Sequence, residues 1–321
     1  MIFEDLNAFI VVAQLRSFSA AAARLRVAQS SLSKRVQRLE HHFGVPLLKR
    51  HARGAILTES GAILLTRAQR LIDELKDVER DVRGVLQQAA GVVRIALPPA
   101  TSPVLAPLIF EQCRLRYPLI RLQLRESTSD TIHNWLSEGE IDIALLYNPE
   151  YGADFEVQTL IVEPLFVIAP ARDPINGLPL VHPENHSLRD LAKLPLVLPR
   201  RPHSIRVLVE RLCAADGTHP NILFESDSIR STKGIVEKGL GCTIFSRTWL
   251  EDDIRAGRLC AIPFSSALLN WKLCIAHARR KDASLAINSV KMLIEEHVAA
   301  LFANGFWRLG TWVANDVHGA S

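Results

Sequence analysis

Residues 28–42, AQSSLSKRVQRLEHH, combine side chains that suit contact with a negatively charged polymer. The stretch starts with one amide and three hydroxyl side chains, those of Gln29, Ser30, Ser31 and Ser33. Three basic side chains follow, those of Lys34, Arg35 and Arg38. Amides and hydroxyls can hydrogen-bond to base edges and phosphates, while lysine and arginine neutralise phosphate charge. A helix that only packs against a core needs no polar cluster on its first turn. The stretch therefore favours a nucleic-acid contact.

Two shorter helical patterns precede this stretch and would hold it in position. Apolar residues at helical spacing predict a helix over residues 6–16. Ser19 is a plausible N-cap of a second helix over residues 20–26. The basic helix would begin at about Ala28 and end before Gly44, a typical C-cap residue.

A short hairpin with basic residues is expected directly after the basic helix. Residues 46–58 predict it, with Gly54 near its tip and Arg50 and Arg53 on its strands or turn. A helix–turn–helix followed by such a wing places its second helix in the major groove of DNA, with the N-terminal residues at the base edges. The two arginines would then reach over the next groove.

The side chains expected to contact DNA come from the helices and the hairpin: Ser19, Gln29, Ser30, Ser31, Ser33, Lys34, Arg35, Arg38, Arg50 and Arg53. In this set Gln29 can pair with adenine, and the lysine and arginine side chains supply positive charge along the phosphate backbone of the DNA. An ordinary three-helix packing unit with a solvated basic face is the alternative that periodicity leaves open.

Charge is distributed unevenly along the chain. Residues 1–58 hold nine Lys and Arg against three Asp and Glu, although the whole chain has a net charge of only +4. With 48% hydrophobic and 22% charged residues, the 321-residue chain is expected to form two or three globular units. A basic module on a nearly neutral body predicts an anionic partner for the N-terminal region alone.

The cysteines give no sign of a metal site or a disulfide framework. All five are scattered, and no C-x-x-C motif is present. No secretory signal or membrane-spanning run is apparent, so we expect a cytoplasmic protein with no cofactor and no resident metal. No P-loop, G-x-S-x-G, G-x-G-x-x-G or H-E-x-x-H motif appears, and the absence of any catalytic constellation favours a protein that is not an enzyme.

A long amphipathic pattern follows the hairpin. Residues 58–89 predict one helix capped by Thr58, with an apolar stripe and an outer face of alternating acids and bases. A helix of this length exceeds what a lone globular helix usually needs. We therefore expect it to pair with the same helix of a second subunit.

From residue 91 onward, strands alternate with helices in two successive sets. The strand patterns cover residues 92–98, 120–126, 141–147, 159–170, 195–199, 222–226, 242–246 and 271–278. Helical patterns cover residues 103–117, 129–137, 205–215, 229–238 and 285–301. This alternation predicts parallel sheets covered on both faces, and two sets joined by two crossings predict two subdomains with a cleft between them.

Ligands in open α/β sheets bind beyond the carboxyl ends of the strands, near helix N-termini. The polar residues at those positions are Thr101, Ser102, Ser129, Asn148, Arg201, His203, Ser204, Asp227 and Ser228. Most of these positions are also those of ordinary helix caps, which is the alternative. Because Arg200, Arg201 and Arg206 lie beside them in the sequence, we expect a small anion, such as a carboxylate.

Residues 18–61, FSAAAARLRVAQSSLSKRVQRLEHHFGVPLLKRHARGAILTESG, resemble the DNA-binding region of LysR-type transcriptional regulators. The agreement covers nearly all of residues 1–66 and extends over three elements. Two departures stand out: Ala28 replaces the usual Ser or Thr, and Leu48 replaces a frequent Phe. The stretch LPRRPHSIR further resembles the subset related to nitrogen-assimilation regulators.

The resemblance implies an α/β chain with an α-rich N-terminal module. Its parts would be a winged helix–turn–helix (1–58), a dimerisation helix (59–90), an effector-binding domain like periplasmic solute-binding proteins (91–300) and a C-terminal extension (301–321). Within the effector domain, lobe I would comprise residues 91–168 and 269–300, and lobe II residues 169–268.

The resemblance also implies partners. Such regulators bind promoter or operator double-stranded DNA as homodimers joined through the long helix, commonly assemble as homotetramers, respond to a small effector in the cleft and act on RNA polymerase. Two alternatives are a small-molecule-binding protein of the solute-binding class and an α/β enzyme fused to a DNA-binding module.

Overall fold

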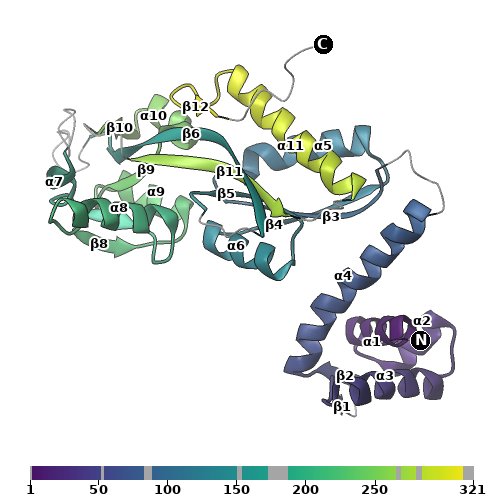
Figure 1. Cartoon of the computed structure of the whole chain (residues 1–321). Coiled ribbons are helices and arrows are strands. Elements are labelled where there is room, and N and C mark those ends of the chain that lie inside the picture. Colours follow the sequence, from purple (N-terminus) through teal and green to yellow (C-terminus); the bar gives the residue numbers. More distant parts are fainter. Residues whose placement is uncertain are drawn as a thin grey trace. The chain divides into compact units, whose positions relative to one another are not determined.

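The structure is a computed structural model that describes residues 2–51, 54–82, 89–149, 154–172, 187–264, 269–279 and 284–313. The chain forms two compact units, one ending at Gly91 and the other running from Val92 to the C-terminus (Figure 1). No helix within the described ranges is long and apolar enough to cross a membrane.

The first unit consists of helices and one hairpin. Its elements are α1 (Ile2–Leu15), α2 (Phe18–Leu25), α3 (Gln29–Phe43), β1 (Leu48–His51), β2 (Gly54–Leu57) and α4 (Glu59–Val82). Phe9, Leu32 and Leu39 are fully buried where the first three helices meet. Burial of such side chains contributes roughly 1.5–3 kcal/mol each, which is what holds short helices together.

The helix boundaries confirm most of the sequence expectations in this unit and correct one. The N-cap of α2 is Ser17, whose Oγ accepts a hydrogen bond from the amide of Ala20, so the prediction of Ser19 as the cap was wrong. Ser19 lies inside the first turn, and its Oγ is 3.0 Å from that of Ser17. At α3, Ala28 occupies the N-cap position without a side-chain cap.

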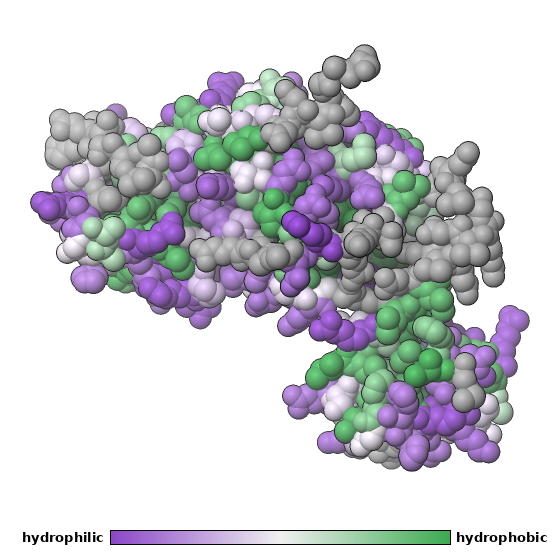
Figure 2. All heavy atoms as spheres, in the orientation of Figure 1, coloured by the Kyte–Doolittle hydropathy of each residue, from purple (hydrophilic) through white to green (hydrophobic). Residues whose placement is uncertain are grey.

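Thr58 caps α4 as expected, because its Oγ1 accepts a hydrogen bond from the amide of Gly61 at 3.0 Å. The helix then continues to Val82, and residues 83–88 of the predicted helix lie outside the described residues. Two large apolar side chains of α4 are exposed to solvent, Ile63 at 62% and Leu71 at 50%. Figure 2 shows hydrophobic surface gathered over this helix. An exposed apolar stripe on a long helix is what a helix–helix contact with another chain requires.

The second unit is an α/β structure with two lobes. Lobe I contains β3 (Gly91–Leu97), α5 (Ser102–Arg116), β4 (Ile120–Glu126), α6 (Ser129–Glu138), β5 (Ile143–Tyr147) and α11 (Leu285–Ala303). Lobe II contains α7 (Leu188–Leu191), β7 (Leu196–Leu198), α8 (Ser204–Ala215), β8 (Ile222–Glu225), α9 (Ile229–Glu237), β9 (Thr243–Ser246), η1 (Arg247–Leu250), α10 (Glu251–Arg255) and β10 (Leu259–Ile262). The strands β6 (Phe155–Pro170) and β11 (Asn270–Ala278) run between the lobes. The last described strand is β12 (Thr311–Trp312).

The sheet order is β10–β6–β11–β5–β3–β4, and β9 and β12 also pair with β6. The registers of β3 with β5 and of β7 with β8 are parallel, as expected, whereas β6 is antiparallel to β9, β10, β11 and β12. The prediction of parallel sheets therefore holds for these two pairs and was wrong for β6 and for β11, which is also antiparallel to β5. The physical reason is the length of β6, whose sixteen residues cross from one lobe to the other and pair with strands in both. This crossing strand runs opposite to the strands beside it in each lobe.

Helices cover both faces of the lobe I sheet, as expected for this class. Helices α5 and α11 pack together on one face, where Arg116 and Glu296 form an ion pair at 2.5 Å, and α6 covers the other face (Figure 1). The short elements α7, η1, α10, β10 and β12 were not anticipated from the sequence. Each is five residues or shorter, which is too short for periodicity to register.

Candidate DNA-binding surface and effector cleft

The α3 helix presents an apolar face inward and a polar face outward. Leu32, Val36 and Leu39 are at most 1% exposed, whereas Gln29 and Lys34 are exposed. Ser30 is exposed as well, and Ser31 and Ser33 are half-buried. The amide, the first hydroxyl and the lysine are therefore available to a partner that approaches the start of the helix.

Two of the predicted DNA contacts also tie α3 to α1. The guanidinium of Arg38 donates two hydrogen bonds to the carboxylate of Asp5, at 2.6 and 3.0 Å, and Arg35 forms an ion pair with Glu4 at 3.5 Å. Asp5 is only 5% exposed, so its charge needs this partner. The hydrogen bonds to Asp5 raise the pKa of Arg38. A phosphate would have to share Arg38 with Asp5.

The hairpin is fixed to α3 by a residue that sequence reasoning missed. Oε1 of Glu40 accepts hydrogen bonds from the amides of Leu47 (2.9 Å) and Leu48 (3.2 Å), which are themselves buried. A single acid near the end of a basic helix, eight residues before a strand, was the available signal. This carboxylate sets the height of the wing relative to α3.

The wing also contacts the segment between α1 and α2. The amide of Ala55 donates to the carbonyl of Arg16 at 2.8 Å. A Cβ on Gly54, whose φ is +137°, would lie 2.2 Å from that carbonyl oxygen, so only glycine fits. Arg50 lies on β1 of this wing, and Arg53 lies outside the described residues.

In the second unit, a cavity of about 380 Å³ lies between the two lobes. From the predicted set it brings together Ser129 and Asn148 of lobe I with Ser204 of lobe II. The hydroxyl of Ser129 accepts from the amide of Tyr147 at 2.9 Å, and Oδ1 of Asn148 accepts from the amide of Lys272. The cavity also includes residues that were not anticipated: Asp130, His133, Asn134, Tyr147 and Arg211.

Other predicted residues do not line this cavity. Thr101 is fully buried and donates to the carbonyl of Pro98 at 3.1 Å, and Ser102 is 5% exposed. Ser228 caps α9 by accepting from the amide of Ser231. Ser228 thus has the helix-cap role that the sequence left open, whereas Thr101 stands at the N-cap position of α5 without a side-chain cap.

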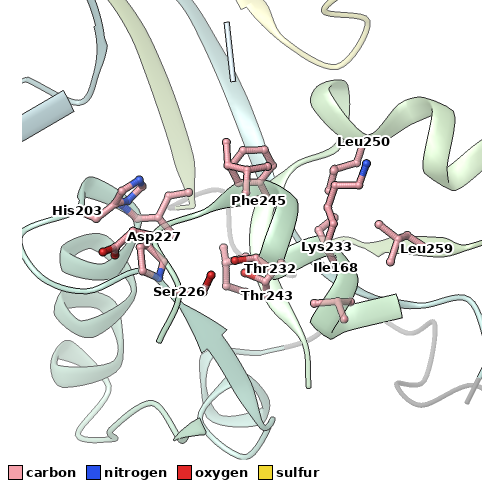
Figure 3. Close-up of a pocket in the computed structure, with 15 residues that line it drawn as sticks. Ile168, His203, Ser226, Asp227, Thr232, Lys233, Thr243, Phe245, Leu250 and Leu259 are labelled. Carbon is pink, nitrogen blue, oxygen red and sulfur yellow. The ribbon is translucent and has the colours of Figure 1, made fainter. Parts of the chain in front are cut away.

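His203 and Asp227 line a second, much smaller cavity inside lobe II, of about 40 Å³. Figure 3 shows both residues with Ser226 at one end of it and Leu250 and Leu259 at the other. Burial lowers the pKa of His203, whose Nδ1 accepts a hydrogen bond from the amide of Ile205. This cavity has room for about one or two water molecules and is too small for an organic effector.

The arginines that suggested an anion are neutralised within lobe II. Arg200 pairs with Asp227 (2.5 Å), Arg201 pairs with Glu210 (2.5 Å), and Arg206 pairs with both Glu210 and Glu225 (2.5 and 2.8 Å). Three carboxylates therefore face three guanidinium groups. These ion pairs remove the electrostatic reason for expecting an anion at the arginines. The partners lie up to 27 residues away along the chain, so the sequence pattern did not reveal them.

A buried carboxyl group connects the lobes next to the cleft. Glu163 of β6 is 1% exposed and accepts hydrogen bonds from the Tyr147 hydroxyl (3.3 Å), the Trp249 indole (3.3 Å) and the Ser246 hydroxyl. Tyr147 belongs to lobe I and the other two donors to lobe II. Burial raises the pKa of Glu163 to about 7, although its donors act in the opposite direction. An isolated acid within the apolar run TLIVEPLFVIAP was the sequence signal for this site.

The same cluster reaches the cavity between the lobes, the candidate effector cleft. The ring of Tyr147 stacks on that of Trp271, with centroids 3.5 Å apart and 10° between the planes. The indole of Trp271 donates to the hydroxyl of Ser204 at 3.2 Å. Tyr147 and Ser204 both line the cleft, so a ligand there would touch groups that join the lobes.

Comparisons with known proteins agree with this arrangement. The model of the bacterial regulatory helix-turn-helix protein, lysR family, matches residues 3–62, and that of the LysR substrate binding domain matches residues 86–299. The HTH-type transcriptional regulator BbuR of Bordetella bronchiseptica is 28% identical, over 94% of this chain and 91% of its own length. The nitrogen assimilation regulatory protein nac of Klebsiella aerogenes is 29% identical, over 90% and 92%.

Solved structures show the same fold. A full-length OxyR variant from Pseudomonas aeruginosa gives a TM-score of 0.69 at 23% identity, covering 97% of this chain and 98% of that one. Full-length CbnR complexed with its target DNA gives 0.62 at 21% identity, covering 93% and 100%. With two family models matching residues 3–62 and 86–299, the chain belongs to the LysR family of DNA-binding transcriptional regulators and is not an enzyme.

Proposed function

We propose that α3 reads promoter DNA through the exposed start of the helix, with Gln29 at a base edge and Ser30 and Lys34 on bases or phosphates. The observation that supports this most directly is the rigid support of that surface. Arg38 bonds to Asp5 on α1, and Glu40 bonds to the amides at the start of the wing. A reading helix held on both sides reaches DNA without an ordering cost.

The remaining predicted contacts divide by their surroundings. Arg50 would place its charge on the backbone beside the wing, and Arg53 is proposed for the same role on sequence grounds alone. Arg35 and Arg38 would contribute less to DNA affinity than unpaired basic side chains, because each already faces a carboxylate. Ser31, Ser33 and Ser19 remain proposed contacts.

The effector is proposed to bind in the interlobe cleft rather than beside the arginines of lobe II. Ser129, Asn148 and Ser204 offer hydrogen-bonding groups there, and a cavity of about 380 Å³ suits a small organic molecule. If the effector is a carboxylate, Arg211 is the lining cation that would face it. Closure of the lobes on the effector would then change the arrangement of subunits on DNA.

The assembly is proposed to be a homodimer joined through α4, and a homotetramer in the complete form. The exposed Ile63 and Leu71 support the dimer contact. The working division is a DNA-binding domain at 1–58, a dimerisation helix at 59–90, an effector domain at 91–300 and an extension at 301–321. Regulation would act through RNA polymerase at the promoter.

Fluorescence anisotropy tests the DNA-reading proposal. The full-length protein is titrated onto DNA from upstream of its own gene and onto a shuffled duplex of equal composition, each at two salt concentrations. Tighter and less salt-sensitive binding to the upstream DNA is expected. Equal and steeply salt-dependent binding to both duplexes would overturn the proposal that α3 reads sequence.

A further inference from the structure

The chain continues past the matched family domain, and its last described residues pack on the second unit and line a cavity. Residues 304–313, here called the C-terminal segment, follow α11 and lie beside α10 and β6 (Figure 1). Trp307 is 1% exposed and meets Trp249 edge-on, with ring centroids 5.7 Å apart. Beyond it, β12 pairs with β6, and the amide of Val313 donates to the carbonyl of Leu160.

The C-terminal segment lines one side of a half-open cavity of about 590 Å³, distinct from the cleft between the lobes. It is lined by α5, η1, α10, the end of α11 and the C-terminal segment, and none of its lining residues lines the cleft. A volume of this size lies within the ~300–1,000 Å³ typical of small-molecule sites. The cavity exists because the C-terminal segment stands opposite η1 and α10.

The lining combines aromatic surface with an excess of positive charge. Trp249 and Phe306 meet edge-on, with centroids 5.3 Å apart, and both face the cavity. Glu251 accepts hydrogen bonds from Arg247 and Arg255, at 3.1 Å each, so a single carboxylate serves two guanidinium groups.

Arg308 of the C-terminal segment is exposed at the same cavity and makes no ion pair with any residue in the described part of the chain. Counting Asp252, the lining holds three cations and two anions. Among the described lining residues, one positive charge is therefore in excess, next to two aromatic rings. This combination suits an anion attached to a flat apolar body.

We propose that this cavity is a second ligand site, for an organic anion with an aromatic or similarly flat apolar body. The anionic group lies against Arg308 and the Arg247–Glu251–Arg255 cluster, and the apolar body lies on Trp249 and Phe306. The site shares no lining residue with the effector cleft, and the proposal does not depend on the one for DNA reading.

Occupancy would affect the junction of the lobes. The ring of Trp249 faces the cavity, while its indole nitrogen donates to Glu163, which also accepts from Tyr147 at the cleft. A ligand that displaces Trp249 changes this shared hydrogen-bond cluster. The second site therefore has a direct route of contacts to both lobes.

Isothermal titration calorimetry on the full-length protein tests the site with a defined probe. The probe is 1-naphthoate, and its neutral counterpart 1-naphthalenemethanol controls for the apolar body alone. Saturable binding of one naphthoate at this site is expected, with the alcohol binding more weakly. Arg308→Gln should weaken naphthoate binding roughly tenfold, since it removes a charge-assisted contact. Arg308→Lys should retain most of the affinity.

The matched control is Arg211→Gln, which removes an exposed arginine from the effector cleft instead. This variant should leave naphthoate binding at the second site unchanged. The proposal is overturned if naphthoate shows no saturable binding in the millimolar range, if Arg308→Gln has no effect, or if Arg211→Gln abolishes the binding. Circular dichroism of each variant confirms that the fold is intact.

Discussion

Trp249 of η1 donates its indole N–H to the carboxyl group of Glu163 across 3.3 Å, and both residues lie where lobe II meets the crossing strand β6. Two further donors to this carboxyl group, Tyr147 and Ser246, come from opposite lobes, and these three donors are uncharged at neutral pH. Arg247, the neighbouring cation on η1, bonds to Glu251 instead. Within the described part of the chain, Glu163 is therefore a buried acid that is held by hydrogen bonds and by no ion pair.

The first prediction concerns the pH dependence of stability. Burial raises the pKa of Glu163 from 4.5 to about 7, so the folded state binds its proton more tightly than the unfolded state. The stabilisation is fully present below the unfolded pKa and is lost as pH rises through about 7. A shift of this size corresponds to roughly 3 kcal/mol. Urea unfolding between pH 5 and 8 should show the decline.

Glu163→Gln should remove most of this decline, because the amide oxygen can still accept from Trp249 and Tyr147 without a charge to desolvate. The exposed Glu126→Gln serves as the control and should leave the wild-type pH profile intact. An unchanged pH slope in Glu163→Gln would assign the dependence to another group.

The second prediction concerns the contact between Trp271 and Ser204 at the cleft. Trp271→Phe and Ser204→Ala each remove one partner of the same hydrogen bond, so their effects should not add. A double-mutant cycle by urea unfolding should give a coupling energy of about 1 kcal/mol. Additive single effects would show that the bond contributes nothing to joining the lobes.

The third prediction separates base reading from phosphate binding. Gln29→Ala should reduce the preference for the upstream DNA over a shuffled duplex by about 1–3 kcal/mol. Lys34→Gln should weaken binding to both duplexes alike and lower the salt slope by about one. Anisotropy titrations over a salt series measure both quantities. The same loss of preference in the two variants would contradict the division of roles.

The fourth prediction concerns the support of the wing. Glu40→Ala leaves the buried amides of Leu47 and Leu48 without their acceptor, which should cost about 1–3 kcal/mol for each unpaired group. DNA affinity should fall with it, because the wing is no longer held against α3. Glu40→Gln is the matched control, since both bonds go to one oxygen that glutamine also provides. Thermal unfolding and anisotropy together decide the outcome.

The sequence predicted the local elements well because their signals are local. The start of α3 and the end at Gly44 follow from residues within one helical turn, and the strand patterns matched the observed strands closely. Ser17 rather than Ser19 caps α2, which is a displacement by two residues among several serines and alanines that pattern alone does not rank.

The pairing of charged side chains was beyond local reasoning. Arg38 reads as a phosphate contact until Asp5, 33 residues earlier, is placed against it. Arg200 reads as part of an anion site until Asp227 is brought to it by the parallel pairing of β7 and β8. The antiparallel course of β6 was missed for the same reason, since strand direction depends on which distant segment lies alongside.

The pairing of β12 with β6 has a further consequence for solubility. Thr311 and Trp312 cover Val162 and Ile161 on the side of β6 that β11 leaves open. An uncovered stretch of strand with apolar side chains is a template for pairing with other chains and for aggregation. Two residues near the end of the chain thus protect the edge of its longest strand, and truncation before Thr311 would expose that edge to self-association.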